Sequence, residues 1–312
     1  MTGGNPFQTG SGVLMDMDPG VDDAVALAVA AVAMPLAGVT TVAGNVGVNE
    51  TTANAGRVLA LLGQDAVPLV AGAAAPLFHP LVTAPRVHGV TGLDGMPPGP
   101  QVSPRALAAE DFWAESWMRN PGGLVATGPA TNVARYLMGR PSGPRPNWMV
   151  WMGGSLSGGN VTPYAEFNAF VDPHAADWVL GAGLPLRVVG LDVTRKARFG
   201  LAAIARMKRL GVVGQALAAV LEAYCRRLGR PWAVLHDVVA VAAAVRPDLF
   251  AWQGRALSVV HDGRERGLLV PVGPMAGRPP VEWAQDLDLV GFYRWFWSCA
   301  ERWEGMGNAG AR

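Results

Sequence analysis

The chain has 312 residues, of which 50% are hydrophobic, and its formal net charge at pH 7 is +1. The apolar fraction excludes a disordered chain, and the small net charge gives no general attraction to nucleic acid or to an anionic membrane surface. We therefore expect neither as a partner, and we expect the only two cysteines, Cys225 and Cys299, to be reduced thiols of a cytoplasmic protein.

The two ends of the chain differ from its middle. Residues 1–11 have no basic start and no apolar run, so we expect a flexible arm rather than a signal peptide. Residues 305–312 are expected to form a flexible tail. The sequence between them has no internal repeat and no long linker, so residues 1–312 are predicted to form a single domain.

An uncharged stretch, Ala24–Asn49, is long enough to span a bilayer. Pro35 and Gly38 interrupt it, however, and a β-branched run follows at Val39–Val42. We therefore predict a buried helix followed by a buried strand instead of a membrane segment.

Short apolar runs alternate with helical patterns along most of the chain. The predicted strands are Val13–Met15, Gly38–Val42, Val67–Val70, Leu124–Ala126, Trp148–Met152 and Leu186–Leu191. The predicted helices among them are Asp22–Met34, Thr51–Leu62, Ala130–Met138 and Pro173–Leu180. Because these strands are apolar without alternation, both of their faces should be covered. The pattern predicts an α/β fold with an open, mostly parallel β-sheet flanked by helices.

The C-terminal part of the chain is more helical. Helices are predicted at Leu201–Arg209, Val213–Leu228 and Val234–Val245. The apolar runs Leu257–Val260 and Leu268–Val272 indicate a late pair of strands.

Four aspartates, Asp16, Asp18, Asp22 and Asp23, lie within eight residues, between the first predicted strand and the first predicted helix. In open α/β sheets, ligands bind beyond the carboxyl ends of the strands, so this is an expected place for a site. Four carboxylates held together repel one another, and a bound cation would remove the repulsion. Oxygen ligands without a nearby cysteine or histidine pair favour Ca²⁺ or Mg²⁺ over zinc.

Two other interpretations of the aspartates remain open at this stage. A solvated acidic turn explains Asp22 and Asp23 at the start of a helix, but it does not explain Asp16 and Asp18 after a buried strand. A phosphohydrolase of the haloacid dehalogenase type also begins with a strand and Asp-x-Asp, with Asp16 as the nucleophile. That type expects Thr or Val two residues after the second aspartate, where this chain has Gly20.

Further polar residues follow the other predicted strands or begin the next helices. They are Asn45, Thr127, Asn132, Asn160, Glu166, Asn168, Asp172, His236 and Asp237. Each alone could cap a helix. Together, at one edge of the sheet, they would form a ring of carboxamides, carboxylates and an imidazole that suits a polyhydroxylated substrate such as a sugar.

These residues belong to an ordered series of motifs that extends from residue 13 to about residue 245. The motifs are Asp16–Leu27, Thr40–Asn45, Val87–Leu93, Leu124–Asn132, Met152–Gly154, Gly159–Asn160, Ala165–Asn168, Asp172–Pro173 and Leu235–Asp237. The series resembles the inosine-uridine preferring nucleoside hydrolase family. Because the motifs occur in the same order as in that family, a chance match has little room. The resemblance implies the Rossmann-like fold of that family.

The resemblance also implies a calcium ion at the bottom of the pocket, held by Asp18, Asp23, Asp237 and the backbone carbonyl of Thr127. The ion would bind the attacking water and the 2′ and 3′ hydroxyls of ribose. Asp18 is then the natural general base, and His236 is the candidate acid for the departing base. Asp16 would support the site from behind.

The resemblance places further residues against the substrate. They are Asp22, Asn45, His88, Met152, Asn160, Glu166, Asn168 and His236. Asp22 and Asn168 would bind the ribose diol, and Asn160 and Glu166 the 5′ hydroxyl. Asn45 would contact the sugar or brace the site. His88 would contact the base, although it could equally be a loop residue without a catalytic role.

We therefore predict calcium-dependent hydrolysis of the N-glycosidic bond of ribonucleosides, which gives ribose and a free base. The alternatives are a catalytically inactive nucleoside-binding or ribose-binding protein and the Asp-x-Asp phosphohydrolase. By resemblance, the protein would be a homodimer or a homotetramer. The preferred base stays open, because Tyr224, Arg227 and Trp232 differ from what the resemblance leads us to expect in a base pocket.

Overall fold

The computed structural model describes residues 12–273 and 277–307. The arm expected at residues 1–11 lies outside the described residues, as do residues 308–312 of the expected tail. Gly305, the first residue of that expected tail, instead ends a short 3₁₀ helix, η3 (Glu301–Gly305).

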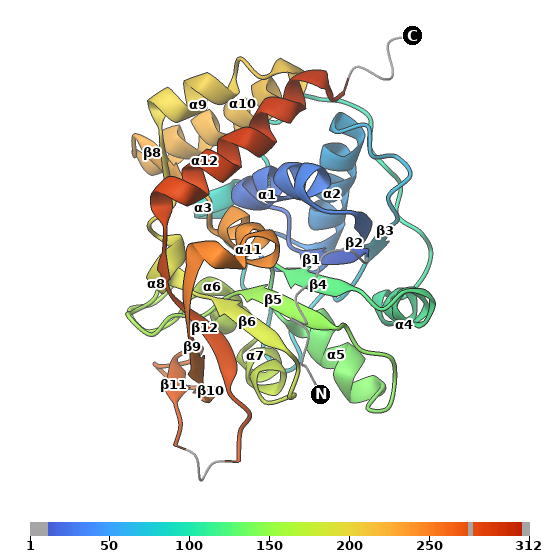
Figure 1. Ribbon diagram of the computed structural model, residues 1–312, viewed down its shortest axis with the longest axis vertical. Coiled ribbons are helices and arrows are strands. Elements are labelled where there is room, and N and C mark those ends of the chain that lie inside the picture. Colours follow the sequence, from blue (N-terminus) through green and yellow to red (C-terminus); the bar gives the residue numbers. More distant parts are fainter. Residues whose placement is uncertain (1–11, 274–276, 308–312) are drawn as a thin grey trace.

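An eight-stranded sheet forms the centre of the molecule, with the strand order β3-β2-β1-β4-β5-β6-β12-β9 (Figure 1). The strands are β1 (Val13–Met17), β2 (Leu36–Thr41), β3 (Leu69–Ala71), β4 (Gly123–Ala126), β5 (Trp148–Met152), β6 (Leu186–Val189), β9 (Phe250–Arg255) and β12 (Val281–Leu287). All neighbours are parallel except β12 and β9. The predicted open, mostly parallel sheet is therefore confirmed.

The strand order reverses at β1, which pairs with β2 on one side and β4 on the other. After β1, the next two strands, β2 and β3, are added on one side of it. The chain then crosses back, and β4, β5 and β6 are added in turn on the other side. Such a switch point leaves a crevice at the carboxyl ends of the strands, where ligands bind in open α/β sheets. The aspartate-rich turn after β1 lies at this point.

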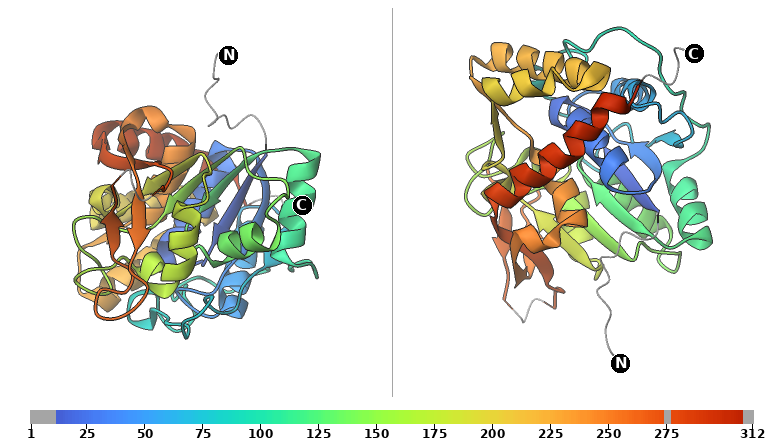
Figure 2. Two further views of the ribbon diagram at one scale, coloured as in Figure 1. Left: turned by 90° about the horizontal axis from the view of Figure 1, so that it is seen from below. Right: turned by 45° about the horizontal axis from the view of Figure 1, so that its top comes forward.

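Helices cover both faces of the sheet (Figure 2). One face carries α1 (Val21–Ala33), α2 (Val48–Leu61), α10 (Gly211–Leu228), α11 (His236–Val245) and α12 (Leu289–Ala300). The other carries α4 (Ala109–Arg119), α5 (Thr131–Gly139) and α7 (Pro173–Leu180). In β5, Trp148 and Val150 pack into the first layer, whereas Met149 and Trp151 pack into the second. Because both faces are buried, the strand needs apolar residues at every position.

Most predicted elements are shifted by one to three residues, and at two places the structure has a different element from the one predicted. The strand predicted at Leu186–Leu191 ends at Val189, because Leu191 begins a short helix, α8 (Leu191–Thr194). The helix predicted from Val234 begins at His236. Residues Trp232–Val234 instead form β8, which pairs antiparallel with β7 (Arg198–Gly200). This two-stranded β7–β8 sheet leads directly into His236.

The remaining short elements connect the larger ones. They are α3 (Pro85–His88), α6 (Phe167–Val171), α9 (Leu201–Met207), η1 (Pro247–Leu249), β10 (Leu257–Val259) and β11 (Leu269–Pro271). β10 and β11 pair antiparallel, which confirms the predicted late strand pair. Across residues 12–273 and 277–307, no helix is both long and apolar enough to cross a membrane. The uncharged stretch Ala24–Asn49 divides into α1, β2 and the start of α2.

The close packing of β4 against β5 yields a stability prediction. A Cβ at Gly123 would lie 2.1 Å from the indole ring of the buried Trp148. Gly123→Ala should therefore lower the free energy of unfolding by about 1–3 kcal/mol, because the packed layer must shift. Gly139→Ala is the matched control, since its Cβ would meet nothing within 4 Å. Equal midpoints for the two variants in urea denaturation would contradict this packing.

Candidate active site

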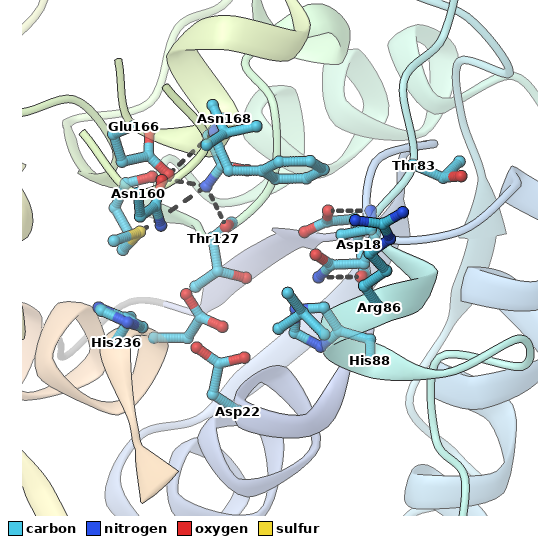
Figure 3. Close-up of a pocket in the computed structure, with 17 residues that line it drawn as sticks. Asp18, Asp22, Thr83, Arg86, His88, Thr127, Asn160, Glu166, Asn168 and His236 are labelled. Atoms are coloured by element: carbon cyan, nitrogen blue, oxygen red, sulfur yellow. Dashed lines mark hydrogen bonds between the residues drawn. The ribbon is translucent and has the colours of Figure 1, made fainter. Parts of the chain in front are cut away.

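A cavity of about 440 Å³ lies at the carboxyl ends of the central strands (Figure 3). Eleven of the residues expected at the site line it: Asp18, Asp22, Asn45, His88, Thr127, Met152, Asn160, Glu166, Asn168, His236 and Asp237. Asp23 does not line the cavity, because it is fully buried beside these residues. The structure thus brings together side chains that are spread over more than two hundred positions of sequence.

The tightest acidic group consists of Asp22 and Asp23 at the start of α1 and Asp237 at the start of α11. Each offers a carboxylate oxygen within 4.8 Å of the other two. Burial, followed by the charge of Asp23, raises the pKa of Asp22 to about 7. The pKa of Asp237 is raised well above its usual range by burial and then by the charges of Asp22 and Asp23. Among residues 12–273 and 277–307, no lysine or arginine forms an ion pair with any of the three.

Asp23 joins three strand ends through its two carboxylate oxygens. Oδ2 accepts hydrogen bonds from the Gly20 N–H at 3.0 Å and from Asn45 Nδ2 at 3.3 Å. Oδ1 accepts from Thr127 Oγ1 at 2.8 Å. Position 20 must be glycine, because a Cβ there would lie 2.4 Å from the His88 ring. The turn after β1, the loop after β2 and the end of β4 are therefore held in register around one carboxylate.

Asp18 has one bonded and one unbonded oxygen. Oδ2 accepts from the Asn45 N–H at 2.7 Å, and Asn45 Nδ2 donates to the Asp18 carbonyl at 3.0 Å. Oδ1 is buried and has no hydrogen-bond partner among the described residues. Burial, followed by the charge of Asp23, raises the pKa of Asp18 well above its usual range. Asn45 thus braces Asp18, and Oδ1 is left to bind a ligand.

This donor set fits a hard divalent cation, because several buried carboxylates and one unpartnered oxygen converge without cysteine sulfur. The geometry adds Asp22 to the ligands that the sequence suggested. The Thr127 carbonyl, another expected ligand, accepts from Asn168 Nδ2 at 2.7 Å. A carbonyl oxygen has a second lone pair, so this bond leaves it able to bind a cation.

Asp16 lies behind the acidic group and does not line the cavity. Its Oδ1 accepts from Thr40 Oγ1 at 2.7 Å and from Asn132 Nδ2 at 2.8 Å. Asn132 also holds the Thr41 carbonyl and the Ala73 N–H, which follow β2 and β3. Asp16 therefore ties the strand ends together, as expected of a supporting residue, and its buried position does not suit the nucleophile of a phosphohydrolase.

His88 is held in a defined orientation. Its Nδ1 accepts a hydrogen bond of 3.1 Å from the Val21 N–H at the start of α1. Burial, followed by the charges of His236 and Arg227, lowers the pKa of His88 to about 3. The ring is therefore neutral at pH 7 and carries its proton on Nε2. This contact fixes the orientation of the ring at the cavity wall, and a catalytic role for His88 stays a prediction.

Arg227 holds the segment that carries His88. From α10, its guanidinium forms an ion pair with Asp94 and donates to the Val87 carbonyl at 3.4 Å. Thr91 Oγ1 donates to the other oxygen of Asp94 at 2.7 Å. Arg227 does not line the cavity, so it positions the segment and does not contact a ligand there.

His236 begins α11 beside the acidic group. Its Nδ1 is hydrogen-bonded to Thr194 Oγ1 at 2.7 Å. Burial and then the charge of Arg195 lower the pKa of His236 to about 4, so the ring is neutral at pH 7. A neutral ring whose Nδ1 is fixed by a hydroxyl presents Nε2 to the cavity as its remaining polar atom.

Glu166 and Asn168 form the opposite end of the cavity (Figure 3). The Glu166 carboxylate caps α6 by accepting from the N–H groups of Asn168 and Ala169 at 2.8 and 3.1 Å. It also accepts from the Gly154 N–H at 2.8 Å, and burial raises its pKa to about 7. Asn168 Nδ2 donates to the carbonyls of Thr127 and Met152, which leaves Asn168 Oδ1 as its acceptor.

Six further residues line the cavity wall that the sequence had not assigned to the site: Thr83, Ala84, Arg86, Val87, Val161 and Phe167. The first four lie in or just before α3, more than ten positions after β3 ends. The Val87–Leu93 motif marked this loop, but nothing in the sequence showed that residues before it reach the site. Phe167 lies within the Ala165–Asn168 motif, whereas the only signal for Val161 was its position next to the expected Asn160.

Comparison with known proteins agrees with this geometry. The sequence model of the inosine-uridine preferring nucleoside hydrolase family matches residues 13–294. The chain belongs to this family. The predicted family resemblance and the predicted enzyme class, a ribonucleoside hydrolase, are thereby confirmed.

Individual members of the nucleoside hydrolase family are similar over nearly the whole chain. The pyrimidine-specific ribonucleoside hydrolase RihA of Enterobacter sp. (strain 638) is 38% identical over 295 residues, which cover 90% of this chain and 94% of RihA. The non-specific ribonucleoside hydrolase RihC of Salmonella typhimurium is 37% identical, covering 91% and 95%. The structure of a plant nucleoside hydrolase, the PpNRh1 enzyme, has a TM-score of 0.87 at 29% identity and covers 95% and 99%.

The acidic group predicts a stabilising effect of calcium. A ligand that binds only the folded state at about 100 times its Kd stabilises it by about 2.7 kcal/mol. We expect Ca²⁺ to raise the Tm of the protein and Asp237→Asn to remove most of that increase, because the variant lacks one of the three clustered carboxylates. Asp248→Asn, at an exposed position outside the cavity, should retain the full increase. The same calcium-induced shift in both variants would contradict the site.

Proposed function

We propose that the protein is a calcium-dependent ribonucleoside hydrolase that cleaves the N-glycosidic bond to give ribose and a free base. The observation that carries the proposal is the convergence of Asp22, Asp23 and Asp237 at the base of a polar cavity. Such a site offers negative charge where the sugar ring becomes positive during bond cleavage. Family membership and the ribonucleoside hydrolase relatives support the same reaction class.

The ribose would bind between the acidic group and α6. Asp22 would accept a hydrogen bond from a ribose hydroxyl. Asn168 would accept another through Oδ1, since its amide nitrogen is engaged by two carbonyls. Asn160 and Glu166 line the same end of the cavity and suit the 5′ hydroxyl. Met152 closes the wall beside them. A bound calcium ion would lower the pKa of the attacking water and hold the 2′ and 3′ hydroxyls.

Bond cleavage sends the electron pair of the C1′–N bond to the base and leaves positive charge on the ribose ring. The buried carboxylates stabilise this charge most strongly when it is largest, which is the requirement for catalysis. Asp18 would remove the proton from the water that attacks C1′, because it lines the cavity and its Oδ1 has no hydrogen-bond partner among the described residues. His236 and His88 would donate hydrogen bonds to the departing base.

Assembly and location follow from the resemblance and the composition alone. We propose a homodimer or homotetramer that acts in the cytoplasm on a small-molecule ribonucleoside. Light scattering during size-exclusion chromatography measures the assembly directly.

The first test of this function is product formation. The protein with Ca²⁺ should release ribose and free base from uridine or inosine, and a chelator should abolish the release. Asp18→Asn should lower kcat by about 10²–10⁴-fold, the usual contribution of a general base. Asp262→Asn, an exposed position outside the cavity, serves as the control. Saturable nucleoside binding without turnover would contradict the proposal and indicate a catalytically inactive nucleoside-binding protein.

A second test concerns the sugar. A site built to hydrogen-bond a hydroxyl rejects the analogue that lacks it by on the order of 10⁴-fold, because its buried groups are then left unpaired. We expect a loss of this order in kcat/KM for 2′-deoxyuridine relative to uridine, and Asp22→Asn should reduce the ratio. Equal kcat/KM values for the two nucleosides would contradict the proposed hydrogen bond between Asp22 and the ribose 2′ hydroxyl.

A further inference from the structure

A second cavity, of about 540 Å³, adjoins the first. The two share five lining residues: Asp22, Val87, His88, Asn160 and His236. Residues of the ribose end, such as Thr127, Glu166 and Asn168, line only the first cavity. The second cavity therefore lies beyond the two histidines, on the side to which a base would project from a ribose bound over Asp22.

The wall of this second cavity is strongly cationic. Arg195, Arg198 and Arg230 all line it, and Asp22 is the only acidic residue of its wall among the described residues. None of the three arginines forms an ion pair with a carboxylate in residues 12–273 and 277–307. Their positive charge is therefore available to a ligand.

The same wall offers flat surfaces for a ring. Trp232 on β8 and Tyr224 on α10 line it. The Arg198 guanidinium lies 5.5 Å from the centre of the Trp232 ring, so charge and ring surface are adjacent. Arg195 donates to the Gly159 carbonyl, which fixes it beside Asn160. Aromatic side chains stack on planar rings, and guanidinium groups bind carboxylates through paired hydrogen bonds.

We propose that this second cavity selects ribonucleosides whose base carries an acidic group, with Arg195, Arg198 and Arg230 as the specificity-determining residues. The inference rests on the proposed function, because it places the ribose in the first cavity. A 5′-phosphate is the other possible source of negative charge. The base is favoured, because Glu166 lines the end proposed for the 5′ group and a carboxylate there opposes a phosphate.

The experiment compares substrates of equal shape and different charge. We would measure kcat/KM for 5-carboxyuridine against 5-carbamoyluridine and for 6-carboxyuridine against 6-carbamoyluridine, with uridine and uridine 5′-monophosphate alongside. We expect the carboxylate of at least one pair to exceed its amide by about 10- to 100-fold, the range for a charge-assisted hydrogen bond. The R198Q/R230Q double variant should bring that ratio close to one. Arg226→Gln, which changes an arginine outside this cavity, should leave it unchanged.

The outcomes separate the two proposals. Failure to cleave uridine and both amides would overturn the proposed function itself. Cleavage of uridine and the amides without a preference for either carboxylate would overturn only the charge selectivity. A higher kcat/KM for uridine 5′-monophosphate than for uridine, without a carboxylate preference, would show that the arginines recognise a 5′-phosphate. That result would contradict the proposal that they recognise an acidic group on the base. If R198Q/R230Q and Arg226→Gln changed the carboxylate-to-amide ratio of kcat/KM equally, Arg198 and Arg230 would not be the residues that select the charge.

Discussion

Mutual repulsion among buried carboxylates is the constraint on which the rest of this structure depends. Asp18, Asp22, Asp23 and Asp237 lie at the carboxyl ends of strands or the first turns of helices, and all four are buried. The described residues provide hydrogen-bond donors but no lysine or arginine ion pair to any of them. Ionising these carboxylates is therefore costly in the folded chain, and both a divalent cation and a positively charged sugar would favour their ionised forms.

In the proposed binding mode, different elements recognise the sugar and the base. The polar residues at the ends of β4 and β5 and in α6 surround the end of the cavity where we place the ribose. The base side comes from other elements, namely α10 and the β7–β8 sheet. His88 and His236 lie at the boundary and line both cavities.

Sequence patterns predicted the centre of the fold better than its edges. β1, α1 and β2 were found because each is apolar over a short local run. β9 and β12 were missed because polar residues such as Gln253 and Glu282 interrupt them, and their state as strands depends on pairing with each other across a long stretch of chain. α12 was missed as well, although its aromatic residues pack against α1 in the core.

In the site, too, the residues marked by a local sequence pattern were predicted, and those brought together by long-range pairing were not. The aspartates were recognisable because they are adjacent in the sequence, and the ribose-side residues because they follow strands. Arg195, Arg198 and Arg230 resemble ordinary surface charges in the sequence. Only the pairing of β7 with β8 carries Arg198 and Trp232 to the same wall.

The contact from Arg227 to the segment that carries His88 links two parts of the site to one helix, α10, which bears on how the preferred nucleobase can change through mutation. α10 provides Tyr224 and Leu228 to the base side, and through Arg227 it also anchors α3. A substitution on this one helix can therefore change both the wall where we propose that the base binds and the position of the His88 imidazole. The aspartates themselves are carried by other elements, namely the turn after β1 and the first turns of α1 and α11. Under the proposed function, substitutions confined to α10 can change the preferred nucleobase while every aspartate is retained.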